Sequence, residues 1–310
     1  MESLQSLNRR RKAVSNIGAI TKAMEVVAAI KMRKSEEVAL DSRPYAFKVL
    51  NLLEKLSRAD SVKNVFTSSH EIKKTLVVLI TSDRGLIGSF NTQAMRAFEN
   101  FIRNDYKKSE DDHEYLAVAV GKKADAYMIK RNFRLVKNFY GFGDLIRVNE
   151  IDPLSVFLTD GFMRGDWDRV VTISMHFRSA LKQEALSREI LPLDFSKIRE
   201  TVSEMVPERG KFSEEKKSPN GFENGIEYIF EPSPKELLEE LMPHLLRMEI
   251  YQLILEANAS EHSARYVAMK SASDNASELT EKLLVQYNKA RQASITGEII
   301  EMSATQSALK

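Results

Sequence analysis

The sequence contains no cysteine among its 310 residues, which excludes disulfide bonds, thiolate zinc sites and a cysteine nucleophile. It also lacks an excess of charge of one sign, since it contains 46 Lys and Arg residues and 44 Asp and Glu residues. A chain that binds nucleic acid through its overall charge would be more basic. The N-terminus lacks the apolar run of a secretory signal, and no run approaches the roughly 20 apolar residues that span a bilayer. These absences favour a soluble protein of a reducing compartment.

Turn-forming residues are scarce as well, with 12 glycines and 8 prolines in the chain. Neither type occurs in residues 244–296. As one helix this stretch would span roughly 80 Å at about 1.5 Å per residue, more than the width of a compact domain, so part of it should project. Small and apolar residues form a narrow seam along it, at Leu253, Ala257, Ser260, Ala264, Ala268, Ala272, Ala276, Leu279, Leu283, Tyr287 and Ala290.

The N-terminal segment has a second seam of the same kind. Its apolar or small residues are Leu7, Val14, Ile17, Thr21, Met24 and Ala28, and Ile20, Val27 and Ile30 widen the face. The sequence "DSRPY" (41–45) predicts a bend, because the residue before a proline avoids helical geometry. The simplest way to cover both seams is a long antiparallel coiled coil of the N- and C-terminal helices.

The middle of the chain alternates short β-rich runs with helical patterns. The runs are "TLVVLIT" (75–81), "YLAVAVG" (115–121), "FRLVKNFY" (133–140) and "VVTISMHF" (170–177), and residues 179–193 can add an edge strand. This alternation predicts an α/β fold with a Rossmann-like central domain. We divide the chain into an N-terminal helix (1–58), a central domain (72–200), a charged flexible insertion (201–226) and a C-terminal helix (227–310).

The segment "TSDRGLIGSFNT" (81–92) follows the first strand and has two interpretations. One is the phosphate-binding loop of an autonomous α/β enzyme with coiled-coil arms. However, no lysine follows Gly88 as in a Walker loop, and Gly85 and Gly88 are only two of the three glycines of a dinucleotide fingerprint. The other interpretation, which we favour, is a structural turn in which Asp83 and Arg84 make local polar contacts. The five histidines lack metal-ligand spacing, so we expect no metal and no cofactor.

Two polar groups lie on the terminal helices. The basic run "NRRRK" (8–12) has no interleaved aromatic residues, which favours a solvated helix end over a scaffold that binds nucleic acid. Asn288, Arg291, Gln292 and Ile295 share one face of the long helix. The arginine and the glutamine offer hydrogen-bond donors for carboxylates or carbonyls of a partner protein. The pattern leaves a partner contact and a solvated face equally open.

Several blocks of the sequence together resemble the gamma subunit of F-type ATP synthase. They are "RRRKAVSNIGAITKAMEVVAAIKMRK", "TSDRGLIGSFNT", "EYIFEPSPKELL", "ASEHSARYVAMKSASDNASEL" and "YNKARQASITGEIIEM". The resemblance implies a non-catalytic rotor stalk that couples ion flow through the membrane c ring to ATP synthesis on the beta subunits. Its partners would be the alpha, beta and epsilon subunits and the c ring, without nucleic acid. The chain would lie on the cytoplasmic face of a bacterial inner membrane, attached through the complex only.

The resemblance also implies roles for single residues. Arg291 and Gln292 match positions that contact the beta subunit, and Met24 matches a position near that contact. Tyr228 and Glu231 match positions where the base of the stalk touches the c ring and the epsilon subunit. No catalytic, cofactor-binding or metal-binding residue is implied for this chain.

Overall fold

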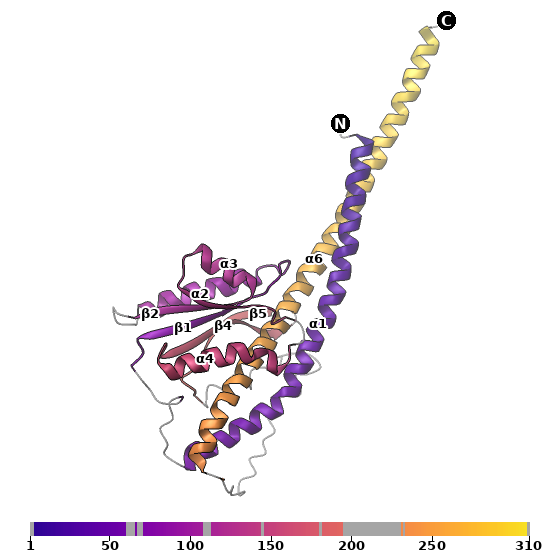
Figure 1. Ribbon diagram of the computed structural model, residues 1–310. Coiled ribbons are helices and arrows are strands. Elements are labelled where there is room, and N and C mark those ends of the chain that lie inside the picture. Colours follow the sequence, from indigo (N-terminus) through magenta and orange to yellow (C-terminus); the bar gives the residue numbers. More distant parts are fainter. Residues whose placement is uncertain are drawn as a thin grey trace. The chain divides into compact units, whose positions relative to one another are not determined.

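The computed structural model describes residues 3–59, 66, 71–107, 113–143, 146–179, 182–194, 231 and 233–308. These residues form two compact units, one of residues 1–28 and 266–310 and the other of residues 29–265. Helices α1 (Leu4–Ala59) and α6 (Pro234–Ala308) each contribute to both units (Figure 1). The expected departure from helical geometry before Pro44 is wrong, because the backbone of α1 stays helical through residues 41–45. The predicted insertion (201–226) lies outside the described residues, and the predicted domain boundaries stay predictions.

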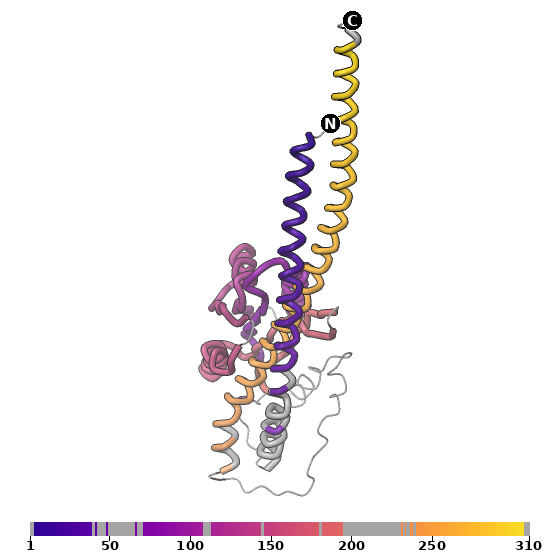
Figure 2. Tube along the Cα trace, turned by 90° about the vertical axis from the view of Figure 1, so that its right-hand side faces the viewer, coloured from indigo at the N-terminus to yellow at the C-terminus, as the bar shows by residue number. Residues whose placement is uncertain are grey.

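In the first unit the two helices pack as a coiled coil with a regular heptad. Among the buried or half-buried positions, those that alternate by three and four residues are 4, 7, 11, 14, 18, 21, 25 and 28 in α1 and 269, 273, 276, 280, 283, 287 and 290 in α6. Asn8, Met24, Tyr266, Ala268 and Ala272 are also half-buried and flank this seam. Gly18 lies against Ala276, and the Arg11 guanidinium lies 5.7 Å from the centre of the Tyr287 ring. These two contacts show that the helices are antiparallel, and the tube view shows α6 continuing past the start of α1 (Figure 2).

The heptad differs in part from the predicted seam. Leu279 and Ile17 lie outside it, with 39% and 54% of their surfaces exposed, and Thr280 and Gly18 take their places. A step of four residues advances about 40° around a helix, so consecutive steps of four drift off the contact face. Only strict alternation of three and four keeps a seam on its partner.

The second unit contains a five-stranded sheet in the order β3-β2-β1-β4-β5. The strands are β1 (Lys74–Ile80), β2 (Glu114–Val120), β3 (Leu135–Phe139), β4 (Arg169–Ser179) and β5 (Lys182–Leu191). The first four are parallel to one another, and β5 is the predicted edge strand, antiparallel to β4. The α/β prediction is therefore confirmed.

Helices cover both faces of this sheet. The residues of β1 alternate between two cores, with Val77 and Leu79 on the side of α2 (Phe90–Tyr106) and α3 (Lys122–Lys130). Leu76, Val78 and Ile80 pack on the side of α4 (Asp152–Arg164) and α6, and the short helix η1 (Val148–Ile151) leads into α4. Gly161 of α4 leaves room for Trp167, because a Cβ atom at that position would lie 2.0 Å from the nearest carbon of the Trp167 ring.

Candidate partner-binding surfaces and polar clusters

Side chains of the segment 81–92 form hydrogen bonds with backbone groups of their own domain. The Asp83 carboxylate accepts hydrogen bonds from the backbone N–H groups of Lys122 (2.9 Å) and Gly141 (3.0 Å). The Thr81 hydroxyl accepts one from the N–H of Ala124 (2.8 Å). The Asp83 and Thr81 side chains thus tie the segment to the start of α3, and within the segment Asn91 Oδ1 accepts a hydrogen bond from the Ser82 N–H (3.1 Å). This supports the structural interpretation of the segment.

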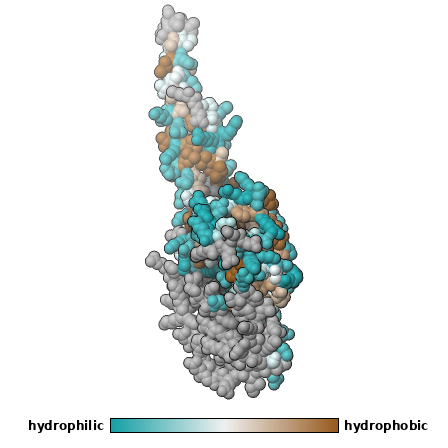
Figure 3. Space-filling model, turned by 90° about the vertical axis from the view of Figure 1, so that its left-hand side faces the viewer, coloured by the Kyte–Doolittle hydropathy of each residue, from teal (hydrophilic) through white to brown (hydrophobic). Residues whose placement is uncertain are grey.

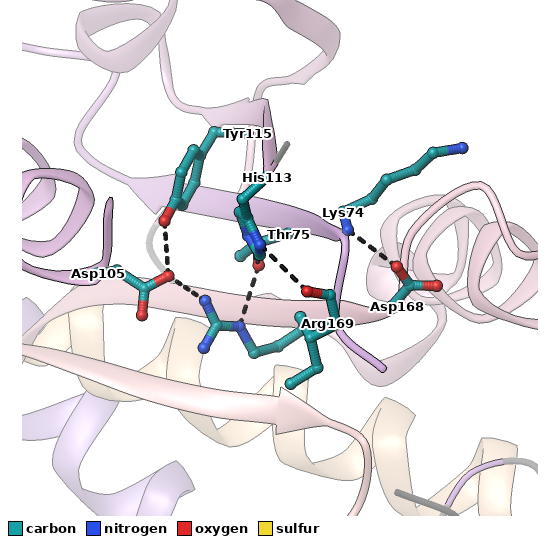
Figure 4. Close-up of polar contacts among 8 residues, drawn as sticks. Lys74, Thr75, Asp105, His113, Tyr115, Asp168 and Arg169 are labelled. Carbon is teal, nitrogen blue, oxygen red and sulfur yellow. Dashed lines mark hydrogen bonds and ion pairs between the residues drawn. The ribbon is translucent and has the colours of Figure 1, made fainter. Parts of the chain in front are cut away.

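A polar cluster that sequence reasoning missed lies at the opposite ends of the strands, where β1, β2 and β4 begin (Figure 4). Arg169 Nε donates a hydrogen bond to Thr75 Oγ1 (3.1 Å), which lies 2.9 Å from His113 Nε2. His113 Nδ1 lies 3.1 Å from the carbonyl oxygen of Ile72, so this nitrogen carries the proton and Nε2 accepts from the threonine hydroxyl. Asp105 pairs with Arg169.

Two further sets of contacts belong to this cluster. Tyr115 donates its hydroxyl hydrogen to Asp105 (2.8 Å), and Asp168 accepts hydrogen bonds from the N–H groups of Lys73 (2.9 Å) and Lys74 (2.8 Å). Thr75 is completely buried, so its hydroxyl is not placed to attack a substrate. The network fastens the starts of β1, β2 and β4 to the end of α2, and we assign it a structural role.

A third polar cluster joins α6 to the sheet within the second unit. Arg188 of β5 donates a hydrogen bond from Nη1 to Glu256 Oε2 (2.6 Å). His176 Nδ1 of β4 also contacts Glu256, and Arg188 Nη2 lies 3.1 Å from the same nitrogen. Burial alone would raise the pKa of Glu256, but the neighbouring Arg188 and His176 outweigh it and lower that pKa. The helical sequence pattern did not reveal this cluster, because charged residues on a helix ordinarily indicate a solvated face.

The residues expected to contact partners lie apart from one another. Arg291 and Gln292 are exposed on α6, and Met24 is half-buried on α1. Met24 and Arg291 lie on opposite sides of the contact between Gly18 and Ala276, so about 30 Å of coil separates them at about 1.5 Å per residue. The structure therefore does not bring these two side chains together. Glu231 is exposed, and Tyr228 lies outside the described residues.

The coiled-coil unit also exposes many apolar side chains (Figure 3). These side chains, each about half exposed or more, are Ile17, Ile20, Val26 and Val27 on α1 and Val285, Ile295, Ile299, Ile300 and Met302 on α6. Exposed apolar surface of this extent is typical of an interaction site.

One segment of α1, Leu4–Val38, is long and apolar enough to cross a membrane by length and composition alone. This differs from the expectation that no run would qualify. Residues 13–30 contain only Lys22 and Glu25 as charged residues, and these two side chains pair with each other at 3.0 Å. One such helix is weak evidence for a membrane span, because a helix of a soluble assembly has the same composition.

Comparisons with known proteins agree over the whole chain. Residues 3–309 match the family described as ATP synthase. The ATP synthase gamma chain of Salinibacter ruber is 33% identical over 318 residues, covering 100% of this chain and 99% of the relative. That of Trichlorobacter lovleyi is 34% identical over 311 residues, covering 100% of both chains. The chain belongs to the ATP synthase gamma family.

Solved structures agree with this gamma fold. A chain of the Euglena gracilis mitochondrial ATP synthase matches with a TM-score of 0.61 and 16% identity, over 99% of this chain and 94% of its own length. A chain from the central stalk and c-ring structure of the Tetrahymena thermophila enzyme matches with a TM-score of 0.59 and 23% identity, over 82% and 99%. Membership of the gamma family makes this chain a stalk subunit and not a catalytic one.

Proposed function

We propose that this chain is the central rotor stalk of a proton-translocating ATP synthase on the cytoplasmic face of a bacterial inner membrane. The observation that carries the proposal is the match to ATP synthase gamma chains over the entire sequence. The coiled coil with its exposed apolar side chains fits a shaft inside a ring of alpha and beta subunits. The chain would reach the membrane only through the complex, in which the c ring and the epsilon subunit bind the base.

In this proposal Arg291 and Gln292 contact the beta subunit. Both side chains are exposed on α6, and an arginine offers a planar set of donors that suits a carboxylate. Met24 contacts the ring at a different height of the shaft, since about 30 Å of coil separates it from Arg291. Glu231 contacts the c ring or the epsilon subunit. Tyr228 does the same, and this assignment rests on the sequence resemblance alone.

Arg291→Ala tests the proposal in the assembled complex. We expect the variant chain to fold normally, because Arg291 is exposed, and to impair assembly or coupled ATP synthesis. If the contact with beta is desolvated, the loss corresponds to about 2–5 kcal/mol. The measurements are copurification with alpha and beta subunits and ATP synthesis by membrane vesicles.

Lys289→Ala is the matched control, since Lys289 is an exposed cation of the same helix on a different face. It should leave both measurements unchanged. Normal assembly and synthesis by Arg291→Ala would contradict the role given to Arg291. A parent chain that never joins alpha and beta subunits would contradict the stalk function itself.

A further inference from the structure

Helix α3 and the edge strand β3 carry a concentrated positive charge. Residues 122–137 contain one acid, Asp125, and six cations, which are Lys122, Lys123, Lys130, Arg131, Arg134 and Lys137. Six cations and one acid give this stretch a formal charge of +5, whereas the whole chain has +2. All six cations are exposed. A charge gathered at one place creates a local field that favours a partner of opposite charge at that place.

Half of these cations already have partners within the second unit. Arg131 and Arg134 each pair with a glutamate of the same domain, and the ammonium group of Lys137 lies over two aromatic rings. Among the described residues, the other three lysines, all on α3, form no ion pair. These three lysines are therefore available to a partner.

The one acid of the stretch is held by neutral donors. The Tyr140 hydroxyl donates a hydrogen bond to the Asp125 carboxylate (2.6 Å), and the side-chain amide of Asn138 donates another (3.2 Å). These contacts fix the carboxylate beside β3. The neighbouring lysines thus keep their charge toward the solvent.

The stability of α3 does not explain where its lysines lie. Lys122 and Lys123 form the start of the helix, where unpaired backbone N–H groups make the helix end positive. Acids are favourable at this end and cations are not. A contact outside the domain explains two adjacent lysines at this end better than a role in the fold does.

An exposed apolar side chain lies among the lysines of α3, which packs beside α2 (Figure 1). Ile129 is 62% exposed, and Ala126 is exposed as well. The helical spacing places both on the same side as Lys122, with Lys123 and Lys130 next to them. An apolar centre with a charged rim is the arrangement found in protein interfaces.

We propose that this side of α3, formed by Lys122, Lys123, Ala126, Ile129 and Lys130, is a docking surface for an acidic protein. The partner would present Asp and Glu side chains around an apolar residue. The lysines attract such a partner and repel basic ones, and Ile129 is the apolar anchor at the centre.

The size of the surface determines the strength of this contact. Helix α3 has 9 residues and is therefore about 13 Å long. A surface this short buries less area than a stable interface does, so the contact is weak and reversible. A lipid bilayer fits the surface less well, because a single isoleucine offers little apolar area for insertion.

The test uses the purified full chain and a fluorescent synthetic peptide of about 20 residues, long enough to form a helix. A stripe of leucines at helical spacing in the peptide is flanked by glutamates. At low salt we expect the parent chain to bind this peptide about tenfold more tightly than a peptide of the same composition in scrambled order. Fluorescence anisotropy measures both affinities.

Two variants separate the charged rim from the apolar centre. Lys122→Glu with Lys123→Glu should weaken binding about tenfold at low salt, and high salt should remove most of its difference from the parent. Ile129→Ala should weaken binding severalfold at low and high salt alike, because apolar contact is not screened. Acids are favourable at a helix start, so the lysine variant should keep the unfolding temperature of the parent.

Lys182→Glu with Lys270→Glu is the matched control, since both are exposed cations outside α3 and the change in net charge is the same. Its affinity should stay within about twofold of the parent. Equal losses in the lysine variant and the control would overturn the proposal, because the peptide would then respond to net charge alone. Equal binding of the ordered and scrambled peptides would overturn it as well.

Two further outcomes are informative. If the lysine variant does not fold, an affinity of Ile129→Ala equal to that of the parent overturns the proposal, and a severalfold loss supports it. Vesicles of phosphatidylglycerol that bind the parent but not the lysine variant, with no effect of that variant on the peptide, would assign the surface to a membrane and overturn the proposal. The free chain is used throughout, so failure of the stalk function would not change these results.

Discussion

The two halves of α6 distribute their residues between core and surface in opposite ways. Residues 251–260 are all buried, including polar ones, whereas residues 291–296 and 298–306 are all exposed. One half is held by directional contacts with a sheet, and the other leaves its side chains available to partners. The balance of buried and exposed residues along a long helix is therefore set by its neighbours at each point, and a rotor stalk needs both a buried and an exposed stretch in one helix.

The largest expected effect comes from removing the charged partner of a residue in the buried half of α6. Arg188→Met leaves Glu256 buried without its guanidinium partner, and we expect the free energy of unfolding to fall by about 3–5 kcal/mol. Arg291→Met in the exposed half should change it by less than about 0.5 kcal/mol. Urea unfolding of the full chain, followed by circular dichroism, measures both. Equal effects of the two substitutions would show that the halves do not differ as described.

The second expected effect depends on pH and again belongs to the buried half. Burial raises the pKa of Glu249 to about 8, so the folded chain keeps a proton that the unfolded chain loses near its ordinary pKa of 4.5. The contribution of Glu249 to stability should therefore fall as pH rises from about 4.5 to about 8, by up to about 1.4 kcal/mol per pH unit, and level off above that. Burial also raises the pKa of Glu36, to about 7, so Glu36 contributes only to the lower part of this window.

Glu249→Gln separates the two carboxyl groups. It should remove the fall between pH 7 and pH 8 and keep the fall below pH 7 that Glu36 produces. Urea unfolding at a series of pH values measures the slopes. An unchanged slope between pH 7 and pH 8 in the variant would contradict the assignment to Glu249.

The smallest expected effect lies in the coiled coil, which is held by close packing of small residues. Gly18→Ala should gain helix propensity of up to about 1 kcal/mol, but its Cβ atom would lie 3.3 Å from the Cβ atom of Ala276. We expect the gain in helix propensity and the cost of the close contact to offset each other to within about 0.5 kcal/mol. Gly18→Leu should instead force the helices apart and lower the thermal unfolding temperature. A leucine at this position without that effect would contradict the close approach of α1 and α6.

The sequence allowed much of this architecture to be predicted, because its strongest signals are local. The absence of glycine and proline from residues 244–296 indicated the long helix, and β-rich runs such as "TLVVLIT" indicated the strands of the α/β domain. The edge strand β5 was also expected, and it is present. Arg291 and Gln292 were assigned through family resemblance, and their contacts with a partner remain a proposal.

The features that escaped prediction depend on contacts between distant residues. The choice of Thr280 over Leu279 for the coiled-coil seam follows from the partner helix and not from residue hydrophobicity. The pairing of Arg188 with Glu256 joins residues far apart in the chain, and each looks like a surface charge in its own segment. Pro44 led us to expect a bend, because the residue before a proline disfavours helical backbone geometry. Helix α1 nevertheless continues through this position, so the preference of one residue does not decide whether a long helix continues.

Rotation of this chain inside the assembled complex is the most direct test of its stalk function. The chain has no native cysteine, so Lys107→Cys, at an exposed position after α2, would give it a single thiol for a probe. With the head of the complex fixed to a surface, we expect the probe to turn in one direction when ATP is added. A probe that stays still while the parent complex hydrolyses ATP would contradict the stalk function of this chain.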